Sequence, residues 1–135
     1  MEINYLAVLV SAVVSMIIGS VWYGPLFGKQ FMHAMGFDTM TPEKQAEMKK
    51  AMTMTYVVQF IASLVMFYVL ARFIGGLGDM TVQNGMTVAF WAWLGFVVPI
   101  KLGDALWGGK MSLFWLGAGY NLVLLLATGA IIGAW

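Results

Sequence analysis

The sequence contains no cysteine, little charge and a single histidine. Without thiols the chain can form no disulfide, no thiolate nucleophile and no cysteine-ligated metal centre. Charged residues make up 10% of the 135 residues and leave a net charge of +1, which excludes the broad basic field that binds nucleic acid. We therefore expect no nucleic-acid partner, no metal site and no cofactor.

Apolar residues, by contrast, dominate the composition. They account for 61% of the chain, and the mean hydropathy is +0.86. A water-soluble domain of this size would have too little polar surface to remain in solution. The composition therefore predicts an integral membrane protein whose partner is the lipid bilayer.

Four apolar runs are long enough to cross a bilayer as helices, because a hydrocarbon core of about 30 Å takes roughly 20 residues. The runs cover residues 5–22, 54–74, 82–100 and 113–134. Strands of a membrane barrel would alternate in polarity instead. The first run lacks the basic start and small-residue cleavage site of a signal peptide, so we expect it to be retained. The sequence predicts an all-α, single-domain, four-helix membrane bundle built from two helical hairpins.

The cations are divided unequally between the two sides of these spans. Six of the seven Lys and Arg residues lie in or beside the connections at residues 23–53 and 101–111, and only Arg72 lies near the opposite side. Segments rich in lysine and arginine stay in the cytoplasm. We therefore expect both connections to be cytoplasmic and both termini to face outward across the inner membrane.

The first span runs into the segment WYGPLFGK. Trp22 and Tyr23 are residue types favoured at headgroup depth, and they mark the cytoplasmic interface. Gly24 can take a left-handed helix cap, while Pro25 stops the same helix and suits the first turn of a new one. The sequence predicts that the chain breaks and restarts here.

The restarted helix is predicted at residues 25–35. At 100° per residue its aromatic rings fall on one side, while Lys29 and His33 fall on the other, until Gly36 ends the helix. This pattern predicts an amphipathic helix lying at the membrane surface. An ordinary polar loop is the alternative.

A long helix is expected next. Thr41 suits an N-cap, and Pro42 fits the first helical position. No breaker follows before Gly75, so the helix reaches about 50 Å at 1.5 Å per residue, longer than the hydrocarbon core. Its first turns should project into the cytoplasm.

Each span carries a narrow stripe of polar or small residues, which in membrane bundles usually faces inward. The stripes are Asn4, Ser11, Ser15 and Trp22; Thr55, Gln59 and Ser63; Asn84, Trp91 and Gly95; and Gly117, Asn121 and Thr128. Two interpretations stay open: hydrogen bonds that hold helices together, or a polar cavity for a small ligand. For the cavity, the candidate ligand-binding residues are Gln59, Asn84, Asp104, Tyr120 and Asn121.

Gly129 and Gly133 form a G-x-x-x-G spacing, which lets two helix backbones approach closely. A neighbour in the same chain or a second subunit could use it. Because four short spans enclose little volume, we predict a homo-oligomer and assign these glycines to its contact.

The third span should kink at Pro99, which lacks a backbone donor and would press against the carbonyl of Gly95. Asp104 follows as the carboxylate nearest the membrane interior, and Trp107 suggests that this segment is still at interface depth. An acid at this depth is either an ion or proton relay or an exposed partner of a nearby lysine.

Methionines accompany His33 in the segment MHAM and recur beyond it, and thioether with imidazole suits Cu(I). Methionine is also a flexible apolar filler, and one histidine without cysteine makes a poor ligand set. Acid–base catalysis needs two positioned groups, and only proximity in the fold, for example to Asp104, could give His33 a partner. We predict no metal ligand and no catalytic residue.

Three blocks recur in a known family: WYGPLFGK at residues 22–29, LWGG at 106–109 and GYN at 119–121. On these blocks the chain resembles small bacterial membrane proteins grouped as domain of unknown function family 1761. The resemblance spans nearly the whole chain and implies a four-helix protein of a bacterial membrane. It implies no reaction, substrate or cofactor, so no catalytic residue carries over.

Three hypotheses for function follow, in order of preference. The first is an oligomeric membrane protein that binds or moves a small molecule or ion through a polar interior. The second is a structural or partner-binding membrane module. The third is an enzyme that modifies lipid at the cytoplasmic interface, with His33 and Asp104 as its acid–base pair.

Overall fold

The computed structural model describes residues 3–36 and 39–135, and within this part every regular element is a helix. Four helical rods are long and apolar enough to cross a membrane: Tyr5–Leu26, Pro42–Leu77, Val82–Gly108 and Met111–Ala134. The all-α class and the four membrane-length helices are therefore confirmed. The second rod begins at Pro42, twelve residues before the apolar run at 54–74, because its charged first turns are helical too.

The rods are subdivided as follows. The first contains α1 (Tyr5–Val21) and a π-helical turn, η1 (Trp22–Leu26), and is followed by the short α2 (Gly28–Ala34). The second is α3 (Pro42–Leu77). The third contains α4 (Val82–Ala92), a second π-helical turn, η3 (Trp93–Val97), and α5 (Val98–Gly108). The fourth is α6 (Met111–Ala134).

Local signals set the ends of these helices. The Thr41 side chain accepts a hydrogen bond of 3.3 Å from the Lys44 N–H, which confirms the predicted start of α3. Asn4 and Thr81 cap α1 and α4 in the same way, through bonds of 3.2 Å and 3.0 Å. Gly36, with φ of 73°, ends the segment after α2 as predicted, because this left-handed conformation favours glycine.

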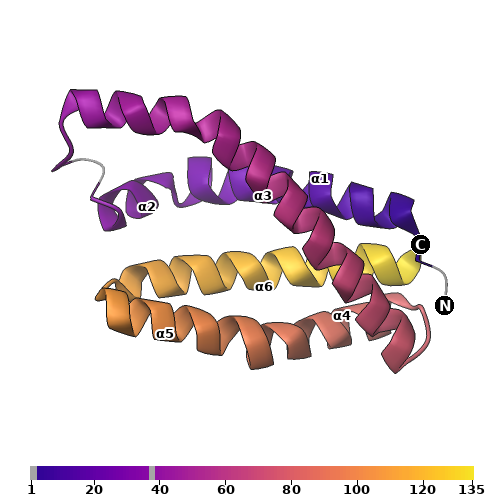
Figure 1. Ribbon diagram of the computed structural model, residues 1–135. Helices are drawn as coiled ribbons and strands as arrows, with labels where there is room; N and C mark the ends of the chain where they lie inside the picture. The colour runs from indigo at the N-terminus through magenta and orange to yellow at the C-terminus, as the bar shows by residue number, and fades with distance from the viewer. Residues whose placement is uncertain (1–2, 37–38) are drawn as a thin grey trace.

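The rods give the molecule two different ends (Figure 1). We call one the terminal end, because the C-terminus, the start of α1 and the α3–α4 turn lie there. We call the other the α2 end, because it carries α2, the first turns of α3 and the α5–α6 turn. Helix α6 lies centrally and contacts α1, α2, α3, α4 and α5. The six lysines all belong to segments of the α2 end.

Glycines bring α4 and α6 into close contact toward the terminal end. A Cβ atom added at Gly129 would lie 2.5 Å from the Gly85 carbonyl oxygen and 2.9 Å from the Ala89 Cβ, and one at Gly133 would overlap the Thr81 carbonyl. Both glycines of the G-x-x-x-G motif are buried. The assignment of Gly129 and Gly133 to an oligomer contact is therefore wrong, because α4 of the same chain covers them.

The interior carries hydroxyl groups rather than a polar cavity. Within the described residues the buried polar side chains are Ser11, Ser15, Ser63 and Thr128. Three of them donate back to carbonyls of their own helices, at 2.7–2.8 Å, and the Ser11 hydroxyl has no partner there. Apolar side chains such as Phe67, Ile74 and Ile132 fill the space around them. The buried members of the stripes therefore lie in contacts between packed helices, with no cavity between them among the described residues.

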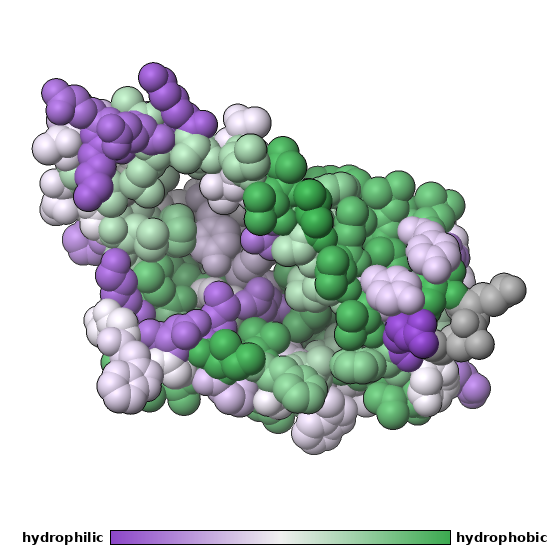
Figure 2. Space-filling model, in the orientation of Figure 1, coloured by the Kyte–Doolittle hydropathy of each residue, from purple (hydrophilic) through white to green (hydrophobic). Residues whose placement is uncertain are grey.

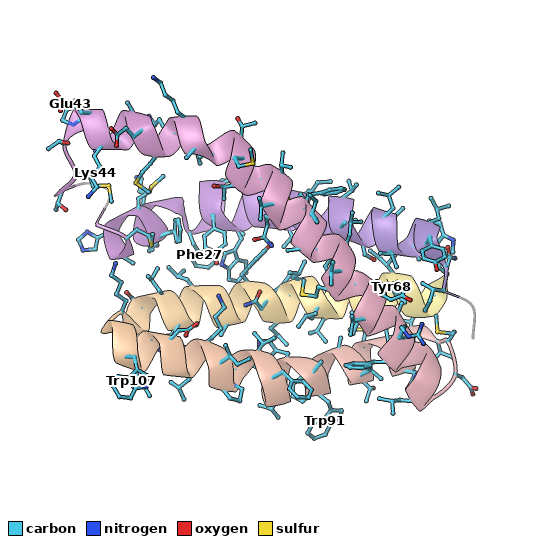
Figure 3. All side chains as sticks on the ribbon, in the orientation of Figure 1. Phe27, Glu43, Lys44, Tyr68, Trp91 and Trp107 are labelled. Atoms are coloured by element: carbon cyan, nitrogen blue, oxygen red, sulfur yellow. The ribbon has the colours of Figure 1, made fainter. Side chains whose placement is uncertain are left out.

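The helices separate toward the α2 end. Residues 46–59 of α3 are all exposed, and Figure 1 shows this half of the helix diverging from the other rods. Figure 2 shows hydrophilic side chains gathered on its beginning and a hollow between it and the rods below. Figure 3 shows Glu43 and Lys44 at its tip. The molecule is thus closed at one end and open at the other.

Candidate functional site

The first rod widens into η1 at the sequence WYGPL. The Phe27 N–H donates to the Trp22 carbonyl at 2.9 Å, a bond that spans five residues instead of four. Pro25 accounts for the widening, because proline has no N–H and clashes with the carbonyl four residues earlier. The regular helix stops at Phe27, whose φ is −128° and ψ 16°. Gly28 then starts α2, where an added Cβ would lie 2.9 Å from the Tyr23 carbonyl oxygen.

The predicted break was placed too early. Gly24 is not among the glycines with positive φ, so it does not form the left-handed cap, and Pro25 lies inside η1. The helix predicted at residues 25–35 is the shorter α2, with Lys29 exposed in its first turn. The error arises because the π turn accommodates Pro25 within the helix. The rod therefore continues four residues beyond the predicted end of the span at residue 22.

The third rod contains the matching η3, and Pro99 follows it. The carbonyl that Pro99 would press against belongs to Gly95, inside η3. Each π turn begins with a tryptophan whose indole N–H donates to a carbonyl of α6: Trp22 to Leu116 at 3.1 Å, and Trp93 to Ala118 at 2.8 Å. Residues two apart on a helix point to opposite sides. The two tryptophans therefore hold α6 from both sides.

An aromatic cluster, composed of Trp22, Tyr23, Phe27, Phe31 and Tyr120, joins η1 and α2 to α6. Its ring centroids lie 4.6–6.5 Å apart, the range of favourable aromatic pairs. The Tyr120 hydroxyl donates to the Ser15 carbonyl at 3.3 Å. Figure 3 shows Phe27 between the first rod and α6. The cluster brings the blocks WYGPLFGK and GYN together in space.

Two glycines make room for this cluster. A Cβ at Gly119 would lie 3.2 Å from the Trp22 ring, and one at Gly19 would lie 3.0 Å from the Tyr120 hydroxyl oxygen. These contacts are tighter than ordinary van der Waals packing. Tyr120, predicted to bind a ligand, is therefore engaged in the junction of α1 and α6.

A small pocket lies between α5 and α6 at the α2 end. It measures about 180 Å³, and Lys101, Asp104 and Lys110 contribute its charged walls beside Phe114. The Lys101 ammonium lies 3.7 Å from the place of a Cβ on Gly117, so this side chain extends along α6. In the described part of the chain none of these three charged groups forms an ion pair. Two lysines and one aspartate leave one positive charge unbalanced.

The remaining predicted residues are scattered. Gln59 is exposed on the diverging half of α3, and Asn121 is half-buried on α6; neither side chain makes a hydrogen bond within residues 3–36 and 39–135. Asn84 belongs to the terminal end, where its amide donates to the carbonyls of Asp79 and Ile74 at 2.8 Å and 3.2 Å. This amide ties the α3–α4 turn, and a ligand-binding role for Asn84 stays a prediction.

The stripe on the third span also needs correction. Trp91 is 62% exposed, and it points away from the bundle in Figure 3, whereas Gly85, Val88 and Ala89 are buried. Small residues mark the inward face here because they permit close backbone approach. Sequence reasoning therefore missed Trp93, whose indole reaches α6. Trp107, at 95% exposed, projects outward at the α2 end, as Figure 3 also shows.

Metal-ligating side chains do not gather in the part of the chain described. No group of three His, Asp or Glu side chains there could hold a metal ion. Lys101, Asp104 and Lys110 could instead hold an anion, since each lysine offers three hydrogen-bond donors and the carboxylate accepts.

Comparison with known proteins identifies the family. The model of the family described as a protein of unknown function (DUF1761) matches residues 6–133, so the chain belongs to that family. This confirms the family indicated by the sequence blocks. No curated protein and no solved structure matches the chain.

Proposed function

We propose that this member of the DUF1761 family is an integral protein of a bacterial inner membrane that binds a small anion in the pocket between α5 and α6. One observation carries the proposal: Lys101, Asp104 and Lys110 line a single pocket without pairing among the described residues. The pocket of about 180 Å³ is smaller than the roughly 300–1,000 Å³ typical of drug-sized ligands. The ligand is therefore a small anion.

The pocket carries both positive and negative side chains, which restricts the chemical class of the anion it can bind. The two lysines attract negative oxygens, while Asp104 repels them unless the ligand also donates a hydrogen bond. A solute with both a negative oxygen and an O–H or N–H group satisfies all three side chains. Hydrogen phosphate, bicarbonate and small hydroxy- or amino-carboxylates belong to this class.

Binding is favoured over passage through a single chain. The bundle interior is filled by apolar side chains and by hydroxyls bonded to their own helices. Transport of the anion would therefore need a route between chains. The polar interior expected of the oligomer would then be formed between chains.

A homo-oligomer remains part of the proposal, through α3 rather than through the glycines of α6. The diverging half of α3 is exposed around Gln59, in an apolar stretch of the helix. Polar side chains at membrane depth rarely face lipid. An amide–amide hydrogen bond with Gln59 of a second copy would satisfy this group.

The orientation is proposed from charge. All six lysines belong to segments of the α2 end, and Arg72 belongs to the other half of the bundle. By the positive-inside rule this supports a cytoplasmic α2 end and outward termini. The anion pocket would then face the cytoplasm.

Equilibrium dialysis of the purified protein in detergent tests the proposal, with hydrogen phosphate, bicarbonate and lactate as probes. At least one should bind, and Lys110→Gln and Lys101→Gln should each weaken it about tenfold, because hydrogen bonds to charged groups contribute about 1.5–3 kcal/mol. Lys44→Gln, on the exposed start of α3, is the matched control and should leave binding unchanged. Equal affinity in all four proteins would refute the pocket.

A partner-binding module without a small ligand is the second candidate, favoured by the exposed half of α3. For this candidate Gln59→Leu should change the mass of the native assembly while no anion binds. If the protein were instead a lipid-modifying enzyme, it should turn over lipid, and His33→Ala should abolish that turnover. We propose no catalytic role for this histidine.

A further inference from the structure

A second concavity lies at the opposite end of the bundle. A groove of about 430 Å³ separates the last turns of α3 from α4 and η3. Its walls include Phe73 and Gly76 of α3 and Val88, Trp91 and Phe96 of the third rod, with Arg72 as its charged member. The volume lies in the range of ligand-binding pockets, about 300–1,000 Å³. Figure 3 shows Trp91 projecting outward beside it.

Arg72 is the only cation among the groove residues. Its guanidinium donates to the Tyr68 hydroxyl at 3.1 Å and lies 5.8 Å from the centroid of the Tyr68 ring. These contacts orient the side chain but leave its charge unbalanced, since no ion pair to Arg72 forms among the residues described. Arginine presents a planar fork of donors that matches phosphate oxygens.

The polarity of the groove changes with depth along the rods. Arg72 precedes the end of α3 at Leu77 by five residues, or about 7.5 Å at 1.5 Å per residue. Phe96 follows the start of α4 at Val82 by fourteen residues, or about 21 Å. The charged group is therefore shallow, as is Phe73 beside it, whereas Phe96 of the groove wall lies deep. A membrane lipid has the same order of groups, with its phosphate at the surface and its acyl chain inside.

From this match we propose that the groove is a binding site for one anionic phospholipid of the leaflet at the terminal end. The lipid phosphate accepts hydrogen bonds from Arg72, and one acyl chain lies against Phe73, Trp91 and Phe96. A lipid with net negative charge, such as phosphatidylglycerol, is preferred because the unbalanced arginine favours it over a zwitterionic lipid. The site is separate from the anion pocket and does not depend on it.

Native mass measurement tests this on protein released from nanodiscs made of equal parts phosphatidylglycerol and phosphatidylcholine with identical acyl chains. Wild type should retain one phosphatidylglycerol per chain, with about tenfold preference, as expected for a hydrogen-bonded charge pair. Equal retention of the two lipids would overturn the proposal.

Two variants locate the site. Arg72→Gln should abolish the preference for phosphatidylglycerol, and Gly76→Leu should reduce retention of both lipids, because its side chain enters the groove where a Cβ meets no atom within 4 Å. Gly103→Leu, equally unobstructed but in α5, is the matched control and should behave as wild type. If the preference survives Arg72→Gln, the lysines of the α2 end bind the lipid and the proposal fails. If Gly76→Leu retains lipid like the control, the groove is not the site and the proposal also fails.

Discussion

The two ends of the bundle are built differently, although the same four rods reach both (Figure 1). Toward the terminal end α4 and α6 meet backbone to backbone through Gly85, Gly129 and Gly133, and Asn84 ties the α3–α4 turn. At the α2 end α3 diverges from the other rods (Figure 1). There the aromatic cluster, rather than close backbone contact, joins η1 and α2 to α6. The difference lies in how the rods meet: at one end the backbones of α4 and α6 are in close contact, and at the other α3 stands apart from the remaining rods.

The π turns mark the transition between these ends. At η1 and η3 a tryptophan extends from the neighbouring rod and holds α6 through its indole N–H. Beyond η1 the chain bends away at Phe27, whereas beyond η3 the helix continues as α5. Pro25 lies inside its π turn and Pro99 lies after its own, so the same residue type bends one rod and only perturbs the other.

The largest expected effect comes from adding a side chain at the closed end. Gly129→Leu should lower the free energy of unfolding by about 3 kcal/mol or more, because the Gly85 backbone cannot move aside. Gly103→Leu at the α2 end meets no atom within 4 Å and should be neutral or stabilising by up to about 1 kcal/mol. Denaturant unfolding in micelles, followed by circular dichroism, measures both.

One result for Gly129→Leu would contradict close packing of α4 on α6 within one chain. If Gly129→Leu kept wild-type stability but changed the mass of the native assembly, the glycines would form a contact between chains after all. The closed end would then be an interface between copies.

The tryptophans should contribute less. Trp22→Phe and Trp93→Phe each remove one hydrogen bond to α6, so each should cost about 0.5–1.5 kcal/mol in the free energy of unfolding. Trp91→Phe is the control, because this exposed ring makes no hydrogen bond among the residues described. Equal losses in all three variants would mean that the indole N–H groups do not hold α6.

The smallest effect is expected at Tyr120. Its hydroxyl bond to the Ser15 carbonyl is long, at 3.3 Å, so Tyr120→Phe should cost about 0.5 kcal/mol, the lower limit for a hydrogen bond. Tyr56→Phe, at an exposed position of α3, should cost nothing measurable. A loss of several kcal/mol at Tyr120 would make the hydroxyl, rather than the ring stacking, the main contact of the aromatic cluster.

The sequence predicted correctly those features of a helix that depend only on neighbouring residues. Thr41, Pro42 and Gly36 marked helix ends correctly, because caps and left-handed glycines depend on neighbouring residues alone. The inward stripe of α3 was also in register: Ser63 is buried, and Gln59 lies one turn earlier. Gln59 is exposed because α3 has left the bundle there, which depends on the tertiary arrangement.

Two features could not be read from the pattern. On α4, polarity pointed to Asn84 and Trp91, whereas contact is governed by residue size, so the face of Gly85 and Ala89 turns inward. The π turns were missed because proline usually ends or kinks a helix, and only a wider turn accommodates it within a rod. Of the candidate site, Asp104 was anticipated, and Lys101 lies one turn before it on α5. The third charged residue, Lys110, joins them because of the way the chain turns from α5 into α6.

The most direct test of the account is the side of the membrane on which each end lies. The natural chain has no cysteine, so one introduced cysteine gives an unambiguous label. Asp79→Cys, exposed at the terminal end, should react with a membrane-impermeant maleimide in intact spheroplasts, whereas Lys44→Cys, exposed at the α2 end, should react only after permeabilisation. Labelling of Lys44→Cys in intact spheroplasts would contradict the account, because the lysine-rich end and its anion pocket would then face outward.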